Sequence, residues 1–229
     1  MIGLMLSSCY TITSSVSPDI LKKKEISNNL GTGLYDNIYI RENQIPEKDL
    51  IFNFRNLKID FLPSFFFMQR FGINSKIEFS YKANFILVIP GAYPDDTWPG
   101  IYSTYLTILK YKLESKKNIK TIFWGTSLER CFIAINDVSF LFGYSTGTTK
   151  GFATTQLEIG RSFGLIHGWL FSGMFNIGHY RPKTRAGIKF IPELGIGYTL
   201  YIDNHSFITY KYGMPTIHLG LGYQRVKNR

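Results

Sequence analysis

The stretch SKIEFSYKANFI, residues 75–86, alternates polar and apolar side chains almost without interruption. Because successive side chains of a β-strand point to opposite faces, this two-residue period predicts a strand with one apolar and one polar face. A tilted strand needs about 9 to 11 residues to cross a bilayer, whereas strands of ordinary globular domains average about 5 or 6. The stretch therefore predicts a membrane-spanning strand. Its apolar face carries Ile77, Phe79, Tyr81, Ala83 and Phe85, and its polar face carries Lys76, Glu78, Ser80, Lys82 and Asn84.

The same period recurs over most of the chain. Small residues share the polar face near the C-terminus, which suits a narrow barrel interior. No segment shows the helical period of 3.6, and no linker divides the chain. We predict an all-β fold, an antiparallel up-and-down transmembrane β-barrel of about 8–10 strands, an even number being usual in single bacterial chains. The further predicted strands are residues 64–72, 101–113, 119–128, 131–144 (one bulged strand or a hairpin), 152–163, 166–177, 186–201, 216–224 and, as a short extra strand, 207–212.

Composition agrees with a β-rich membrane protein. Phe, Tyr and Trp make up 16% of the 229 residues, and 21 glycines favour tight turns. The mean hydropathy of −0.03 does not exclude a spanning barrel, because lipid-facing and interior residues alternate and average out. The net charge of +10 comes from scattered Lys and Arg, which suits phosphate-rich lipid surfaces and does not indicate nucleic-acid binding. Two distant cysteines, Cys9 and Cys131, do not indicate a disulfide framework.

The N-terminus carries a short motif. Leu6-Ser7-Ser8-Cys9 resembles the bacterial lipobox, in which the cysteine is acylated, and residues 10–17 resemble a polar lipoprotein tether. A basic n-region is missing, and the apolar stretch is shorter than the roughly 7 to 15 residues of a signal peptide. The alternative is a short apolar terminus that ends in Ser-Ser-Cys without modification. We predict a leader or tether over residues 1–48, with a short strand at 34–40, and one barrel domain over residues 49–229.

Three stretches resemble small bacterial outer-membrane barrel proteins, several of which are predicted lipoproteins. FFFMQRFGINSKIE, residues 65–78, resembles a recurrent hairpin of such barrels, and residues 191–197 resemble their penultimate hairpin. Residues 217–223 resemble their last strand, which the barrel-assembly machinery reads, although this chain continues past Tyr223 where many barrels end on an aromatic residue. The resemblance implies a bacterial outer-membrane location and assembly by that machinery.

The polar strand faces place charged residues in the barrel interior. In a barrel of about eight strands side chains fill the interior, so we expect an interlocked ionic core and a narrow or plugged lumen. We expect aromatic anchors at the membrane interface at Trp98, Trp169 and Tyr223. Residues 90–100 and 178–185 are predicted extracellular loops. The predicted lumen-facing residues are Lys76, Glu78, Lys82, Lys110, Lys112, Glu158 and Glu193.

Catalytic and metal-binding patterns are weak. Residues 143–147 match G-x-S-x-G, but a nucleophile elbow needs a helix after the serine, and another predicted strand follows here. His205 and Ser206 are adjacent on a strand and would point to opposite faces, so the histidine is badly placed to activate the serine. The four histidines have no metal-ligand spacing. We expect no enzyme activity, no cofactor and no metal site.

The function predicted from these features is a structural or interaction role in the outer membrane. We expect its partners to be membrane lipids, lipopolysaccharide among them, the assembly machinery and an envelope protein. Three alternatives remain open: a periplasmic lipocalin-like barrel with its apolar face inward around a hydrophobic ligand, a narrow channel, and a barrel lipid hydrolase.

Overall fold

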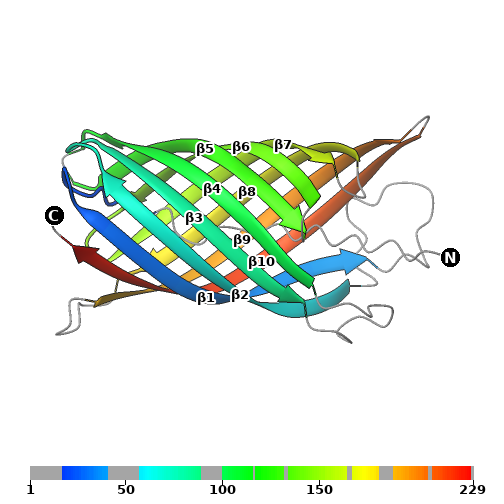
Figure 1. Ribbon diagram of the computed structural model, residues 1–229, viewed down its shortest axis with the longest axis horizontal. Coiled ribbons are helices and arrows are strands. Elements are labelled where there is room, and N and C mark those ends of the chain that lie inside the picture. The colour runs from blue at the N-terminus through cyan, green and yellow to red at the C-terminus, as the bar shows by residue number, and fades with distance from the viewer. Residues whose placement is uncertain are drawn as a thin grey trace.

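The computed structural model describes residues 17–40, 57–88, 100–115, 117–131, 134–163, 167–180, 188–205 and 208–227. Within these ranges, ten antiparallel strands close into one barrel, and the all-β up-and-down prediction is confirmed (Figure 1). The strands are β1 (Ile26–Ile40), β2 (Leu57–Gly72), β3 (Ile77–Val88), β4 (Gly100–Leu113), β5 (Ile119–Cys131), β6 (Ala134–Gly147), β7 (Gly151–Phe163), β8 (His167–His179), β9 (Ile188–His205) and β10 (Ile208–Lys227).

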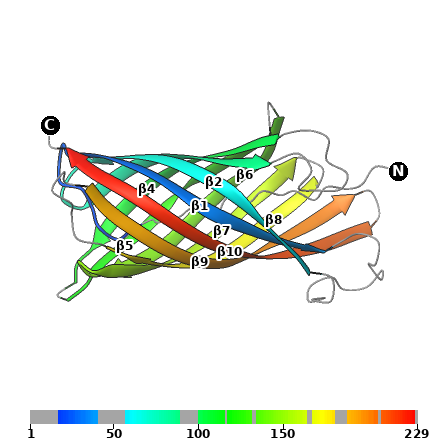
Figure 2. The same cartoon turned by 90° about the horizontal axis from the view of Figure 1, so that it is seen from below.

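The barrel closes by pairing its first strand with its last. β1 pairs with β2 on one side and with β10 on the other, as the 90° view shows (Figure 2). In the closing register Leu30 lies opposite Tyr223 and Gly31 opposite Gly222. Every strand therefore has two hydrogen-bonded neighbours, which removes the open sheet edges that a bilayer does not tolerate.

The predicted leader boundary at residue 48 is wrong, because β1 belongs to the barrel wall from Ile26 onward. The sequence of this segment does not reveal a strand. Ser27, Asn28 and Asn29 are all polar, so the alternation of apolar and polar residues that marks the other strands is missing. Pairing with both β2 and β10 holds the segment in the wall instead. At the other end of the chain, the described part of the predicted separate strand 207–212 belongs to β10, which begins at Ile208 and continues unbroken through Pro215.

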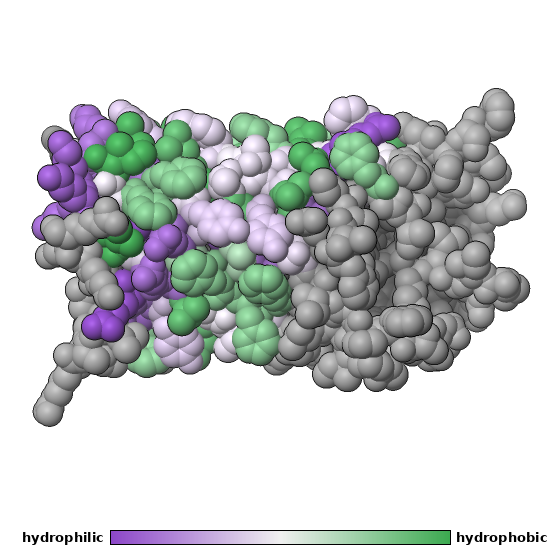
Figure 3. Space-filling view, viewed as in Figure 1, coloured by the Kyte–Doolittle hydropathy of each residue, from purple (hydrophilic) through white to green (hydrophobic). Residues whose placement is uncertain are grey.

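The wall carries its apolar side chains outward. On β7 the large residues Leu157, Ile159 and Phe163 are exposed, while Gln156 and Glu158 on the other face are buried. Figure 3 shows hydrophobic side chains spread over the wall of the barrel. A lipocalin-like barrel requires the reverse, so the described wall contradicts the alternative of an apolar face turned inward.

The interior is more apolar than predicted at mid-wall. Leu106, Ile108, Phe123 and Leu141, from β4, β5 and β6, form a buried cluster inside the barrel. These side chains lie on the inward faces of their strands, the same faces that carry buried charged residues nearer the ends of the barrel. Side chains thus fill part of the interior with hydrocarbon, in addition to the charged groups that the sequence predicts.

The two ends of the barrel differ. We call the turn end the one where β1 begins, β10 ends, and the connections 73–76, 114–118, 148–150 and 180–187 join the strands. The loop end carries the connections 41–56 and 89–99 and three short ones. The two predicted extracellular loops cannot share a side, because residues 89–99 follow an odd-numbered strand and residues 180–187 follow an even-numbered one.

Candidate functional site: a charge cluster at the turn end

Three charged side chains from neighbouring strands meet inside the barrel at its turn end. Arg70 of β2 donates from Nε and Nη2 to the two carboxylate oxygens of Glu78 on β3, at 2.8 and 2.7 Å. Lys110 of β4 lies 2.9 Å from Glu78 Oε1. All three side chains are at most 1% exposed. One carboxylate thus bridges two buried cations, and the trio keeps one uncompensated positive charge.

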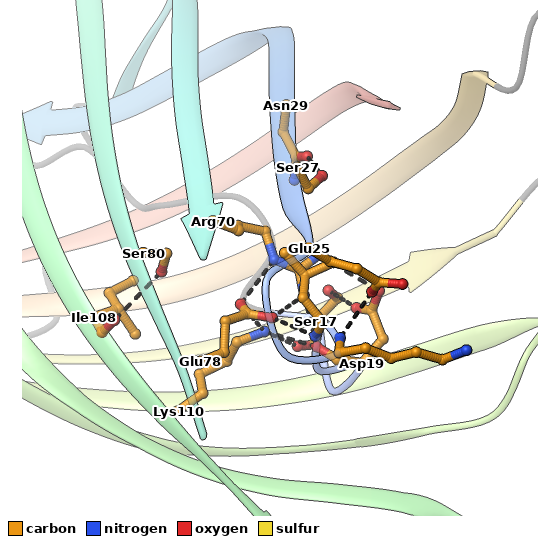
Figure 4. Close-up of polar contacts among 12 residues, drawn as sticks. Ser17, Asp19, Glu25, Ser27, Asn29, Arg70, Glu78, Ser80, Ile108 and Lys110 are labelled. Atoms are coloured by element: carbon orange, nitrogen blue, oxygen red, sulfur yellow. Dashed lines mark hydrogen bonds and ion pairs between the residues drawn. The ribbon is translucent and has the colours of Figure 1, made fainter. Parts of the chain in front are cut away.

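A fourth charge comes from the segment before the barrel. Residues 17–25, the inner segment, lie inside the turn end, and Figure 4 shows Asp19 beside Arg70 and Lys110. Arg70 Nη1 lies 3.4 Å from Asp19 Oδ2, and Nη2 donates to the Asp19 carbonyl at 2.7 Å. Lys110 Nζ donates to the carbonyls of Ser17 and Asp19, both at 2.9 Å. Asp19 balances the excess positive charge of the wall residues.

Backbone hydrogen bonds tie the inner segment to the wall. The N–H of Leu21 donates to Glu78 Oε2 at 2.9 Å, and Gly72 exchanges hydrogen bonds with Glu25 and Lys24 at 3.0 Å. Lys24 has a left-handed backbone with φ of 67°, which turns the segment into β1. A Cβ on Gly72 would lie 1.9 Å from the carbonyl oxygen of Lys22. Glycine at position 72 therefore permits the segment to pack this closely.

The electrostatics of the inner segment favour an ionised Asp19. Burial alone would raise the pKa of the Asp19 carboxyl, but Arg70 and Lys110 outweigh it and hold that pKa well below its usual value. Tyr180, which follows β8, donates its hydroxyl to Asp19 Oδ1 at 3.3 Å. Burial raises the pKa of Tyr180, so the phenol stays neutral and acts as a donor. The Ser17 hydroxyl also donates to the Asp19 carboxylate.

The structure places most of the predicted lumen residues inside the wall. Glu78, Lys82, Lys110, Glu158 and Glu193 are buried. Lys82 lies over the ring of Phe66, with Nζ 4.5 Å from the ring centroid, and Glu158 accepts a hydrogen bond from Ser139.

Two predicted lumen residues lie elsewhere. Lys76 belongs to the exposed turn before β3, because the Asn74 side chain accepts its backbone N–H and caps the turn. There it pairs with Glu114 at 2.8 Å. Lys112 shares the inward register of Lys110 but lies near the end of β4, where its side chain is exposed. The two-residue period predicts the face of a residue and not the depth at which the strand ends.

Sequence reasoning missed Arg70, Asp19 and Tyr180. Arg70 shares the inward face of β2 with Phe66 and Met68, so the two-residue period could have predicted that it points into the barrel. Because these two neighbours are apolar, the sequence does not mark this face as the polar one. Nothing in the local sequence around Asp19 or Tyr180 indicates that either approaches Arg70, because 51 residues separate Asp19 from Arg70 and 161 separate it from Tyr180.

Two of the predicted interface anchors lie on the outer surface. Trp169 is exposed near the loop end of β8, with the guanidinium of Arg161 5.4 Å from its ring. Tyr223 lies on the outward face of β10 and packs edge-on against Phe190, with ring centroids 5.0 Å apart. Trp98 and Cys9 lie outside the described residues, as does Ser206 of the His205-Ser206 pair.

The G-x-S-x-G match lies in β6. Ser145 is buried inside the wall, where its hydroxyl lies 2.8 Å from Thr154 Oγ1, and β7 follows after a short turn. Among the described residues, no group of three His, Cys, Asp or Glu side chains is placed to hold a metal ion. Over the same part of the chain, no helix is long and apolar enough to cross a membrane.

Exposed basic side chains gather at the turn end. They belong to the inner segment, the strand ends and the short turns, at the end of the barrel where Figure 3 shows hydrophilic surface. Among the residues whose side chains the structure describes, the turn end thus carries a group of exposed positive charges. These residues are Lys22, Lys23, Lys24, Lys76, Lys112, Lys117, Lys150 and Arg225.

No protein-family model and no curated protein matches the chain. Among solved structures, the outer membrane protein AlkL is 9% identical, with a TM-score of 0.38 over 96% of this chain and 96% of its own. Neisserial surface protein A is 7% identical, with a TM-score of 0.34 over 87% of this chain and 96% of its own. Ail, the attachment invasion locus protein of Yersinia pestis, is 13% identical, with a TM-score of 0.24 over 88% and 99%.

Proposed function

We propose that this chain is an integral barrel of the bacterial outer membrane with a structural or interaction role. The observation that carries the proposal is the apolar outer surface of a closed barrel. Large side chains such as Phe140, Phe171 and Ile196 are exposed on neighbouring parts of the wall. A soluble protein rarely exposes so continuous an apolar surface, whereas lipid requires it. Closure also leaves no unpaired strand edge in the hydrocarbon.

The two ends suggest an orientation. Bacterial outer-membrane barrels have short turns on the periplasmic side and longer loops outside. The turn end, with the inner segment and the end of β10, then faces the periplasm. The loop end, with residues 41–56 and 89–99, faces outward and is the natural place for contacts with lipopolysaccharide or an envelope protein.

We also propose a lumen closed at the turn end. Asp19 and the backbone of the inner segment contact charged residues of the adjacent strands β2, β3 and β4 at this mouth, and Tyr180, which follows β8, contacts Asp19 from another part of the wall. The apolar cluster around Phe123 and Leu141 fills part of the interior beyond it. This arrangement favours a structural barrel over an open pore and over a lipid hydrolase, because the described serine of the G-x-S-x-G match is buried and bonded to Thr154.

The lipid partners follow from charge. The exposed lysines of the turn end lie beyond the apolar wall, at the level where headgroup phosphates would be, and each such charge attracts an anionic surface by about 1 kcal/mol. The last strand, β10, would be read by the assembly machinery during insertion. Acylation of Cys9 would add a second attachment on the periplasmic side.

Membrane extraction tests the proposal. Isolated outer membranes should retain the chain after high-salt and alkaline carbonate washes and release it only into detergent. Unboiled protein should migrate faster than boiled protein on a gel, because a closed barrel resists the detergent. The Cys9→Ala variant should behave in the same way. Release by carbonate would contradict a spanning barrel, and release of Cys9→Ala alone would mean that a lipid anchor, not the barrel, holds the chain.

A further inference from the structure

Two carboxylates, those of Glu78 and Asp19, balance the charges of Arg70 and Lys110, and they differ in burial and in their distance from the cations. Glu78 belongs to the wall, is fully buried, and lies within 2.7 to 2.9 Å of both cations. Asp19 belongs to the inner segment, keeps 26% of its side-chain surface exposed, and meets Arg70 at 3.4 Å. Lys110 contacts the backbone around Asp19 and not its carboxylate. Asp19 is therefore the anion that can leave without breaking the wall.

Departure of Asp19 would leave several donors without partners. Arg70 would keep only its bonds to Glu78, Lys110 would lose two carbonyls, and the Tyr180 hydroxyl would lose its acceptor. One carboxylate would then face two buried cations. An unbalanced buried charge and unsatisfied donors carry a large free-energy cost, which an incoming anion would relieve.

We propose that Arg70, Lys110 and Tyr180 form a binding site for a small carboxylate in the mouth of the barrel, and that the chain's own Asp19 occupies it here as an internal ligand. The planar guanidinium suits a carboxylate, which it can bind through parallel hydrogen bonds. Lys189, whose Nζ lies 4.3 Å from the centroid of the Tyr180 ring, adds positive charge beside the site.

The site is reachable from the solution at the turn end. Asp19 is partly exposed, and the inner segment is tied to the wall by a few hydrogen bonds rather than by strand pairing. A soluble carboxylate competes with Asp19 for the same donors, and its binding releases the inner segment from the mouth. The contacts at this site do not depend on the membrane in which the barrel lies. The carboxylate-site proposal and the outer-membrane proposal can therefore be tested independently.

Chemical rescue with acetate tests the site. The full-length Asp19→Ala variant, folded in detergent, should lose its heat-resistant fast-migrating form about 5 °C below the wild type. Acetate, the side-chain analogue of Asp19, should restore this midpoint in a saturable way. Half-maximal recovery should fall within about 1–100 mM, as expected of so small a ligand. Acetamide, neutral and of the same shape, should restore nothing when sodium chloride equalises the ionic strength.

Three further variants make the test specific. Glu114→Ala removes an exposed carboxylate paired with Lys76, and its midpoint should not respond to acetate. Tyr180→Phe in the Asp19→Ala background should weaken acetate recovery several-fold, because one donor is lost. Lys110→Met in the same background should abolish recovery. Since Tyr180 lies outside the strands, its variant remains informative where the Lys110 variant does not fold.

Each possible result either supports the proposed carboxylate site or contradicts it. Recovery with acetate but not acetamide, lost in the Tyr180 or Lys110 double variant, supports the site. Equal recovery with acetamide, an acetate response in Glu114→Ala, or an Asp19→Ala midpoint that matches the wild type and ignores acetate would each overturn it. The fractionation of the wild-type chain is unaffected by any of these results.

Discussion

Arg70 and Glu78 are diagonal neighbours on β2 and β3 inside the barrel, with both oxygens of the Glu78 carboxylate hydrogen-bonded to the Arg70 guanidinium. The two residues lie on β2 and β3, one on each side of the turn at 73–76. Their pairing fixes the turn end of this hairpin and creates the surface that receives the inner segment. The same carboxylate holds Lys110 of β4 and the backbone of Leu21, so four parts of the chain meet at one side chain.

Removing the Glu78 carboxylate should destabilise the barrel more than any other charge change at the turn end. Glu78→Ala leaves Arg70 and Lys110 buried without their shared counter-ion, which typically costs about 3–5 kcal/mol. Urea unfolding from detergent or lipid vesicles measures the loss. Glu114→Ala, whose carboxylate is exposed, should leave the midpoint unchanged. Equal stability of Glu78→Ala and the wild type would mean that the cluster contributes nothing to folding.

A side chain at position 72 should displace the inner segment. The Cβ of Gly72→Ala would collide with the Lys22 carbonyl at 1.9 Å, and backbone atoms cannot move aside as a flexible side chain can. We expect single-channel conductance in planar bilayers to rise above that of the wild type. Gly173→Ala is the matched control, because its Cβ would meet only Leu157 Cδ2 at 3.4 Å. Unchanged conductance in Gly72→Ala would argue against a mouth closed by this segment.

A charge on the outer face should be costly in proportion to its depth. Ile159→Arg on β7 places a guanidinium in the lipid near mid-wall, with an expected loss of about 2–4 kcal/mol. Phe163→Arg at the end of the same strand should lose only about 0–1 kcal/mol, because the side chain reaches the interface. Unfolding in lipid vesicles compares the two. If both variants lost the same free energy of unfolding, the two residues would lie at the same depth in the bilayer. That result would contradict the proposal that β7 crosses the membrane along its length.

Acid should release the inner segment through Asp19. The pKa of Asp19 is lowered in the folded chain, so its contribution to stability is fully present above the usual carboxyl value of about 3.9 and is lost as pH falls toward the lower folded value. The wild type should therefore lose stability below about pH 4 more steeply than Asp19→Asn, which cannot ionise. Thermal midpoints between about pH 2.5 and 7 test this. Parallel curves for the two proteins would exclude an ionised Asp19 as a stabilising group.

The alternation in residues 75–86 was sufficient to predict a long strand with one apolar and one polar face, and β3 is found there with Phe79 and Phe85 exposed and Glu78 buried. The two-residue period is a local property of the extended backbone, so the sequence alone determines it. The same alternation would serve a barrel with an apolar interior. The direction of the faces became definite only when the wall closed around Arg70, Glu78 and Lys110.

The tertiary structure alone decided the strand count, the place of β1 and the charge cluster. Polar residues 27–29 give no strand signal, and β1 exists because β2 and β10 both offer it hydrogen bonds. Asp19 meets Arg70 across 51 residues and Tyr180 across 161. Such meetings depend on how the closed barrel sets the register of its strands and where its first residues fold back. The sequence by itself determined a wall with two faces, and barrel closure decided which of its charges meet.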